Sequence, residues 1–407
     1  MLWFGQIFSQ LAINTLLFVL ALRIYQTTLS NSAVSGLFIA YGIPALLFGM
    51  IAGTAVDRLD KRRMLVFCDA IRAFVTVGLM FTSHQVVVVY IFTFFNAIVT
   101  QFYIPSEAPL IPKLVSKELL VSANSLFSMT FYSSLAIGTL LSGPLLRLFG
   151  PFGIFIFLAG LFALASYFSS RIPSQSIGTV GIRYISGLNP SYVLKKIWTD
   201  LLDGIRYIMQ TPTLFDAIML LTGTQIIFAL LGTLGPGFAD RVLSIDIRDS
   251  SVFIVGPAVL GILCGVLWVG SKGYKYRRES LIQSGITGAG ISLVLIASIA
   301  WLLRFPFTEI FHLSKIIFPV EVFLFFLLGV ANSLLDVPAN TNLQEKAQGS
   351  MRGRVYGMLT AFVGGVGVMP VLLGGVLADT IGVGTVIFTL GMGIVLYAVY
   401  RVRYTHS

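Results

Sequence analysis

Three carboxyl groups lie inside or at the ends of long apolar stretches of the sequence. Glu321 stands well inside the apolar run of residues 316–337, and Asp336 lies at the end of that run. Glu107 follows the apolar run of residues 86–103. A carboxyl group in an apolar segment is costly as an anion and can take up and release a proton. We interpret Glu321 as the first candidate for proton coupling, whereas Glu107 and Asp336 are equally compatible with interfacial charges.

Polar side chains recur at helical spacing inside four apolar runs. Residues three, four or seven positions apart share one face of a helix. Such faces are costly against lipid, so we expect them to line a water-filled cavity or to hydrogen-bond between helices. These candidate cavity residues are Gln6, Gln10, Asn14, Asn96, Thr100, Tyr103, Thr222, Gln225 and Asn332.

Asp69 and Arg72 are three positions apart in another apolar run, where a helix would bring the carboxylate to the guanidinium. We interpret them as a structural ion pair. His84, His312 and His406 have no partners at metal-ligand spacing, and the sequence has neither a phosphate-binding glycine loop nor a nucleophile beside a base. We therefore expect no enzymatic activity, no metal site and no cofactor.

Apolar helices must position these residues. Hydrophobic residues make up 56% of the 407-residue chain and charged residues only 11%, against about 25% charged in soluble domains. A helix needs about 20 apolar residues to cross the hydrocarbon core. Twelve such runs are present, at residues 2–25, 33–56, 64–83, 86–103, 123–146, 152–169, 214–239, 252–270, 281–303, 316–337, 356–379 and 383–402. The sequence predicts an all-α membrane protein with 12 transmembrane helices.

Basic residues are distributed unevenly between the two sets of alternate loops. One set, with the C-terminal tail, holds twenty Lys and Arg, and the opposite set holds six. The richer set is expected in the cytoplasm, and an even number of spans then places both termini there. The net charge of +10 is thereby explained without a nucleic-acid partner. No basic arm precedes the first run, so we expect no cleavable signal peptide. We expect a multi-pass protein of the cell inner membrane.

A polar interval at residues 171–212 divides the chain into an N-terminal half, residues 1–170, and a C-terminal half, residues 213–407. The second part of this linker, residues 191–210, has one apolar and one charged face at helical spacing. This pattern is typical of an amphipathic helix on the membrane surface. We interpret it as a cytoplasmic connection between two six-helix halves.

The two halves show signs of an internal repeat. Pro105 matches Pro338 and Gly150 matches Gly382, with offsets of 233 and 232 residues. The first runs of the halves, near Leu2 and Leu214, and the Arg-rich loops, near Asp57 and Gly273, are separated by offsets of 212 and 216 residues. Two six-helix halves in the same orientation are typical of a class of secondary transporters.

The loop after the second run carries a specific motif. Its sequence GTAVDRLDKRR, residues 53–63, resembles the G-x-x-x-D-R-x-G-[RK]-[RK] loop of the major facilitator superfamily, with Asp60 in place of one glycine. A glycine permits close helix approach, an acidic residue can face another helix N-terminus, and basic residues anchor the cytoplasmic side. The resemblance implies a cytoplasmic gate, whereas a charged turn is the alternative. The residues concerned are Gly53, Asp57, Arg58, Lys61, Arg62 and Arg63.

More of the chain resembles one branch of that superfamily, the macrolide-efflux and enterobactin-exporter family of drug:proton antiporters. The similar stretches are DAIRA at 69–73, PSEA at 105–108, IPKLV at 111–115, DGIRY at 203–207, NLQ at 342–344 and RGRVYG at 352–357. Lysophospholipid transporters are similar as well. In the fifth run, Gly138, Gly143 and Pro144 look like the motif of proton-exchanging exporters, although plain helix packing explains them equally well.

The resemblance implies a secondary transporter with the major facilitator fold that exports a small amphipathic drug, macrolide or siderophore by alternating access. Its partners would be the substrate, protons and the lipid bilayer, and we expect a monomer. A lysophospholipid or other lipid transporter of the same fold is one alternative, and a receptor or scaffold without transport is another. We expect Asp379, at the outer end of the eleventh run, to be solvated.

Overall fold

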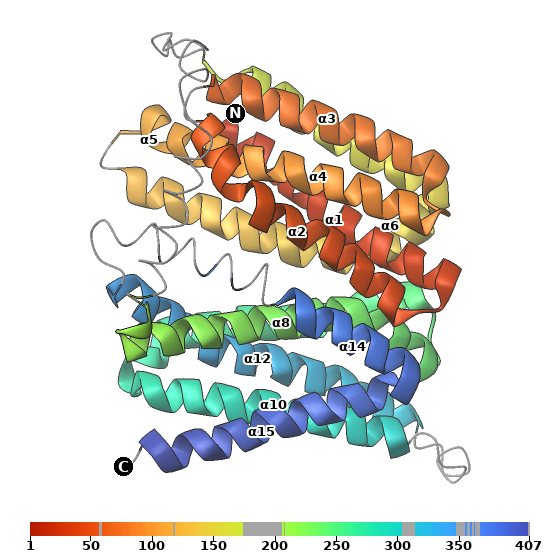
Figure 1. Ribbon diagram of the computed structural model, residues 1–407, viewed down its shortest axis with the longest axis vertical. Coiled ribbons are helices and arrows are strands. Elements are labelled where there is room, and N and C mark those ends of the chain that lie inside the picture. The colour runs from red at the N-terminus through yellow and green to blue at the C-terminus, as the bar shows by residue number, and fades with distance from the viewer. Residues whose placement is uncertain are drawn as a thin grey trace. The chain divides into compact units, whose positions relative to one another are not determined.

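A computed structural model describes residues 1–56, 59–116, 119–173, 208–302, 314–346 and 367–405, with residues 206, 355, 359 and 362. The regular elements in these ranges are all helices (Figure 1). The predicted gate residues Asp57 and Arg58 and nearly all of the predicted linker helix lie outside the described residues.

The chain divides into two compact units. Unit 1 consists of Met1–Thr27 and Gly36–Leu201, and unit 2 consists of Thr28–Ser35 and Leu202–Ser407. The short segment that joins the first two helices thus belongs to unit 2, whereas the chain on both sides of it belongs to unit 1.

The first part of the chain forms long apolar helices joined by short turns. They are α1 (Leu2–Thr28), α2 (Asn31–Val56), α3 (Lys61–Thr82), α4 (Val86–Glu107), η1 (Ala108–Leu110), α5 (Ile111–Leu114) and α6 (Leu120–Ser170). Helix α3 packs against both α4 and α6. Asp60 is the N-cap of α3, because its carboxylate accepts a hydrogen bond from the Arg63 N–H at 2.9 Å. This capping role explains why an acidic residue can replace the glycine of the motif at position 60.

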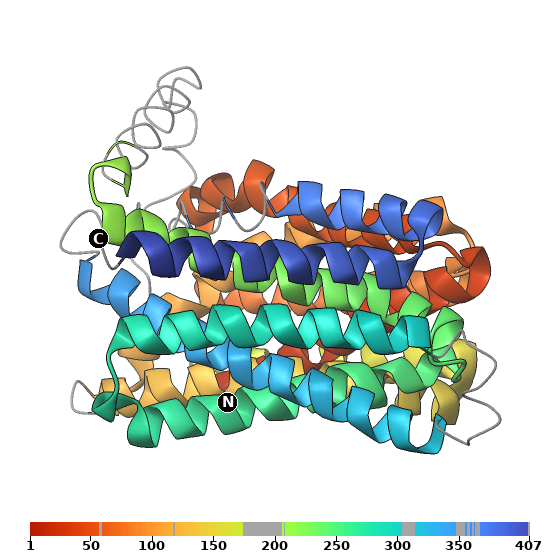
Figure 2. The ribbon, with the colours of Figure 1, turned by 90° about the horizontal axis from the view of Figure 1, so that it is seen from below.

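The second part repeats this helical organisation. Its helices are α8 (Pro212–Arg241), η4 (Ile247–Asp249), η5 (Ser251–Val255), α9 (Gly256–Lys272), η6 (Gly273–Lys275), α10 (Arg278–Leu302), α12 (Ser314–Lys346), α14 (Val368–Ile381) and α15 (Val383–Thr405). Helix α10 lies between α12 and α15 and packs against both (Figure 2). Helices α9 and α12 approach closely, since a Cβ at Gly261 would lie 2.0 Å from the Phe326 carbonyl oxygen.

The two glycines at the repeat offset occupy equivalent turns. Gly150 has φ of 69° and interrupts α6 between its two apolar halves. Gly382 has φ of 91° and separates α14 from α15. Left-handed backbone is accessible to glycine at little cost, so a sharp reversal between consecutive apolar helices is possible at each point.

Nine stretches of the described chain are long and apolar enough to span a membrane, by length and composition. Helix α14 is a shorter apolar helix, and the predicted eleventh span is continuously described only from residue 367. Large apolar side chains such as Phe74, Phe81 and Leu267 are exposed. Exposed apolar surface on helices of this length fits a lipid environment. The exact number of twelve spans stays a prediction.

Candidate functional site

A buried charge cluster lies inside unit 1, formed by three helices. Asp69 and Arg72 of α3 are 0% and 2% exposed, and their nearest charged atoms are 3.3 Å apart. Ser9 of α1 joins them, because its hydroxyl donates to Asp69 Oδ1 at 2.7 Å and accepts from Arg72 at 2.8 Å. Thr100 of α4 accepts a further hydrogen bond from Arg72 at 2.9 Å. The guanidinium therefore bonds to groups on α1, α3 and α4.

Aromatic rings complete the surroundings of Arg72. Its guanidinium carbon lies 4.6 Å from the ring centroid of Tyr103 and 5.9 Å from that of Phe162. Both distances are within the range of a cation–π attraction. An arginine in an apolar interior is thus held by a carboxylate, two hydroxyl groups and two aromatic faces.

Glu107 adds a second carboxylate to this environment. It is buried and lies one helical turn after Tyr103 on α4, whose ring faces the Arg72 guanidinium. Its Oε1 and the Oδ2 of Asp69 have no hydrogen-bond partner among the described residues. An unpaired buried carboxylate is costly, and binding of a proton would remove its charge.

The polar residues predicted on α1 and α4 lie in different surroundings. Gln6 is buried and donates to the Phe127 carbonyl at 3.3 Å, whereas Gln10 and Asn14 are half-buried and the Asn14 amide donates to the Gln10 carbonyl at 2.9 Å. Asn96 is buried beside a void of about 10 Å³. A void of this size holds about one water and not a substrate.

In unit 2, Glu321 of α12 is 0% exposed, and neither of its carboxyl oxygens has a partner among the described residues. Asp336, on the same helix, is half-buried and accepts a hydrogen bond from Thr224 of α8 at 3.3 Å. Thr224 is not among the residues predicted from the sequence, although its hydroxyl group in an apolar run was an available signal. Glu321 is therefore the more isolated of the two carboxyl groups.

The other polar candidates of unit 2 differ in burial. Thr222 is buried, and its hydroxyl has no partner among the described residues. Asn332 is buried on α12, whereas Gln225 is exposed on α8. A shared role for these residues in substrate binding stays a prediction.

Two residues of the predicted gate motif, Arg62 and Arg63, line an open groove. Gly53 lies in α2, and Lys61 is buried at the start of α3. Arg62 donates to the Ser170 carbonyl, and Arg63 is exposed. The groove has a volume of about 630 Å³ and is lined by residues of the α3 N-terminus and by Ser170.

The predicted glycine and proline motif lies in α6. A Cβ at Gly138 would lie 3.1 Å from the backbone nitrogen of Thr15, so this glycine allows α6 to approach α1. Gly143 is buried, and Pro144 is exposed within the helix. The packing of Gly138 is consistent with the helix-packing interpretation.

Salt bridges join the ends of several helices in unit 2. Arg401 of α15 contacts Asp216 of α8 at 2.7 Å and Glu279 of α10 at 2.8 Å. Arg278 contacts Glu345 of α12 at 2.6 Å. No group of three or more His, Cys, Asp or Glu that could hold a metal ion occurs among the described residues.

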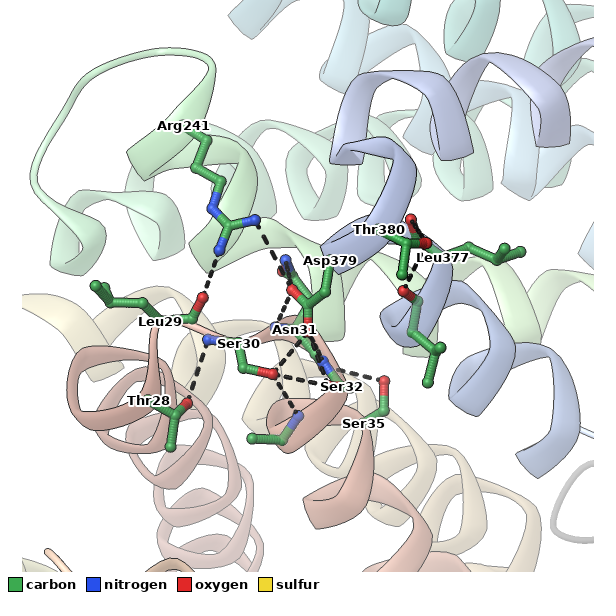
Figure 3. Close-up of polar contacts among 12 residues, drawn as sticks. Thr28, Leu29, Ser30, Asn31, Ser32, Ser35, Arg241, Leu377, Asp379 and Thr380 are labelled. Carbon is green, nitrogen blue, oxygen red and sulfur yellow. Dashed lines mark hydrogen bonds and ion pairs between the residues drawn. The ribbon is translucent and has the colours of Figure 1, made fainter.

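The expectation that Asp379 is solvated is wrong. Its carboxylate accepts five hydrogen bonds from residues 30–32 and lies 3.8 Å from Arg241 (Figure 3). The sequence places Asp379 at the end of an apolar run, and nothing in that pattern shows that the N-terminus of α2 comes against it.

Comparison with known proteins identifies the family to which the chain is similar. The model of the Major Facilitator Superfamily matches residues 2–371. Similar relatives include the uncharacterized MFS-type transporter YfiS of Bacillus subtilis (strain 168), 23% identical with 92% of this chain and 85% of the relative covered. Macrolide efflux protein A of Streptococcus pyogenes is 24% identical, covering 94% and 89%. The multidrug efflux pump Tap of Mycolicibacterium fortuitum is 22% identical, covering 88% and 84%.

Solved structures show the same fold. The nucleoside transporter NupG matches with a TM-score of 0.72 at 10% identity, covering 98% of this chain and 96% of the other. A POT family transporter in complex with 5-aminolevulinic acid matches with a TM-score of 0.73 at 13% identity, covering 99% and 95%. At such low identity the likeness concerns the fold alone.

Proposed function

Because the chain belongs to the Major Facilitator Superfamily, we propose that it is a proton-coupled exporter of a small amphipathic molecule of the drug, macrolide or siderophore type. Members of this superfamily are transporters and not enzymes, and the bacterial relatives fit an inner-membrane location. The efflux proteins among the relatives support the direction of transport.

The proposed exporter has twelve transmembrane helices in two halves, residues 1–170 and 213–407, joined by the cytoplasmic linker at residues 171–212. The apolar runs of the sequence and the matching turns at Gly150 and Gly382 support this arrangement. Both termini lie in the cytoplasm, and the chain works as a monomer. Alternating access moves one half relative to the other.

Buried carboxyl groups without complete partners carry the proposal of proton coupling. Neither carboxyl oxygen of Glu321 has a hydrogen-bond partner among the described residues, and neither does Oε1 of Glu107. A charge in such surroundings is costly, whereas a proton on the carboxyl group removes it. Glu321 is the first coupling residue, with Glu107 and Asp336 as further candidates. Asp69 and Arg72 hold α1, α3 and α4 together.

The remaining polar residues are the proposed substrate-binding groups. The buried Gln6, Asn96, Thr222 and Asn332 supply hydrogen-bonding groups on α1, α4, α8 and α12. A cavity that is apolar with a few polar groups suits an amphipathic molecule. The loop with Asp57 and Arg58 closes the cytoplasmic side when the cavity faces outward.

Accumulation of dyes and antibiotics in efflux-deficient cells tests this function. Cells with the protein should accumulate less of at least one compound, and a protonophore should restore accumulation. The Asp57→Asn variant is the inactive control, and Glu345→Gln is a control for loss of an exposed carboxylate. Accumulation equal to that of cells without the protein, across the whole panel, would reject drug export and favour a lipid substrate.

A further inference from the structure

The turn between α9 and α10 carries three exposed cations and three exposed aromatic rings. We define this aromatic–basic turn by its exposed side chains, which are Trp268, Lys272, Tyr274, Lys275, Tyr276 and Arg277. We propose that the turn binds the headgroup of an anionic glycerophospholipid, whose acyl chains lie along the exposed face of α9. This site is separate from the proposed transport function and does not depend on it.

The cations of the turn are not neutralised by acidic residues nearby in the chain. Residues 250–278 contain neither Asp nor Glu. Glu279 follows the turn directly, and its carboxylate already contacts Arg401 at 2.8 Å. Arg278 is likewise paired with Glu345 at 2.6 Å. Within the described part of the chain, the other three cations of this segment, at positions 272, 275 and 277, form no salt bridge, so their charge is available to a ligand.

The aromatic rings give the turn the chemistry of a membrane interface. The ring centroids of Trp268 and Tyr276 lie 5.5 Å apart, and the Tyr276 N–H donates to the Gly273 carbonyl at 3.0 Å. Lys275 Nζ lies 5.8 Å from the ring centroid of Tyr274, which is 80% exposed. Trp and Tyr are enriched at headgroup depth because the ring is apolar and its N–H or O–H reaches water. The rings therefore place the cations beside lipid headgroups.

The exposed face of α9 leads from the hydrocarbon core to this turn. Leu260, Leu263 and Leu267 recur three and four positions apart, so they share one face, and all three are exposed. The other face packs against α12, because a Cβ at Gly261 would lie 2.0 Å from the Phe326 carbonyl oxygen. The stretch Ile247–Lys275 is long and apolar enough to span a membrane. The leucines thus present an apolar surface to acyl chains.

The two surfaces together favour a phospholipid over a small anion. Basic residues just beyond a membrane span attract anionic lipid, and the attraction is electrostatic. A free phosphate would contact the cations alone and would leave the rings and the leucines unused. An anionic glycerophospholipid matches the charge of the turn with its phosphate and the apolar face of α9 with its acyl chains.

Trp268 can report directly on lipid at the turn. The protein has four tryptophans, and Trp3→Phe, Trp198→Phe and Trp301→Phe together leave Trp268 alone. This full-length reporter is reconstituted in phosphatidylcholine vesicles that contain a small fraction of brominated phosphatidylglycerol or of brominated phosphatidylcholine. Bromine quenches tryptophan fluorescence at short range, so the two quenching curves give the binding constant of the anionic lipid relative to the zwitterionic lipid.

The relative binding constant should exceed one at Trp268 and should fall when cations are removed. Lys275→Gln with Arg277→Gln should lower it about fivefold for each charge lost, at low ionic strength. Lys275→Arg with Arg277→Lys keeps both charges and should preserve the preference, which separates loss of charge from a defect in folding.

Two controls test whether the effect is local. Arg171→Gln with Arg403→Gln removes the same charge from exposed ends of α6 and α15 and should leave the preference at Trp268 unchanged. A second reporter keeps Trp301 alone, at the other end of α10, where its ring lies 4.8 Å from that of Phe388. This reporter should show no preference for phosphatidylglycerol.

Three results would overturn the proposal. The first is an equal relative binding constant in the Trp268 reporter and in its Lys275→Gln/Arg277→Gln variant. The second is the same preference at Trp268 and at Trp301, because the lipid would then respond only to the overall charge of the protein. The third is displacement of phosphatidylglycerol by inorganic phosphate beyond the effect of chloride at equal ionic strength, which would assign the turn to a free phosphate.

Discussion

Removing the charge of Asp69 should destabilise the protein strongly, because Arg72 would stay buried without its anionic partner. Both side chains are almost inaccessible to solvent. Breaking a buried pair by removing one partner costs about 3 to 5 kcal/mol. Arg72 would keep its hydrogen bonds to Ser9 and Thr100 and its contact with the Tyr103 ring. We therefore expect Asp69→Asn to lower the free energy of unfolding by about 3 kcal/mol, at the lower end of that range.

The assay is a double-mutant cycle on the purified protein in detergent, with unfolding followed by tryptophan fluorescence. Asp69→Asn, Arg72→Gln and the double variant are compared. The double variant should be more stable than the sum of the single changes predicts, by at least about 1 kcal/mol. Glu345→Gln is the matched control and should change the unfolding free energy very little, because Glu345 and Arg278 are 54% and 47% exposed.

The result that refutes this reasoning is additivity. If the two single changes sum to the double change within about 0.5 kcal/mol, the two side chains do not act as a pair. Arg72 would then be held by its hydrogen bonds to Ser9 and Thr100 and by the Tyr103 ring, independently of the Asp69 charge.

Three further changes test separate parts of the structure. Glu321→Gln should leave the protein inserted but make export insensitive to a proton gradient, as followed by efflux from preloaded vesicles at two pH differences; an unchanged gradient dependence would remove Glu321 from coupling. Asp57→Asn should abolish export with normal membrane expression, measured by dye efflux and immunoblotting, and normal export would contradict the gate. Gly329→Ala should lower the unfolding free energy by about 1 to 3 kcal/mol, because its Cβ would lie 1.9 Å from the Ala258 carbonyl oxygen. Gly223→Ala, with open space around the new methyl group, should not, and equal losses in both variants would refute the packing argument.

Composition and local periodicity predict the helical fold well, because every apolar run must satisfy its backbone hydrogen bonds internally. The spacing of Asp69 and Arg72 predicts that they meet, since three residues make nearly one turn. The match of Gly150 with Gly382 predicts corresponding positions in two repeated halves, and both residues have positive φ. These features depend on residues that are close in sequence or repeat at one offset.

Contacts between distant segments could not be predicted in the same way. Ser9 and Asp69 are 60 positions apart, and Asn31 and Asp379 are 348 positions apart. A single sequence shows that Asp379 ends an apolar run, but the partner that replaces water depends on how helices assemble. The polar pattern on α8 likewise led to Gln225, which is exposed, and missed Thr224, which donates to Asp336.

The most direct test of proton-driven export uses the purified protein in liposomes with an imposed pH difference. Export of a dye identified in cells should accelerate when protons can flow opposite to the dye, and nigericin should abolish the acceleration. In the Glu321→Gln variant the rate should not respond to the pH difference. Equal export by the wild-type protein with and without the pH difference would contradict proton coupling.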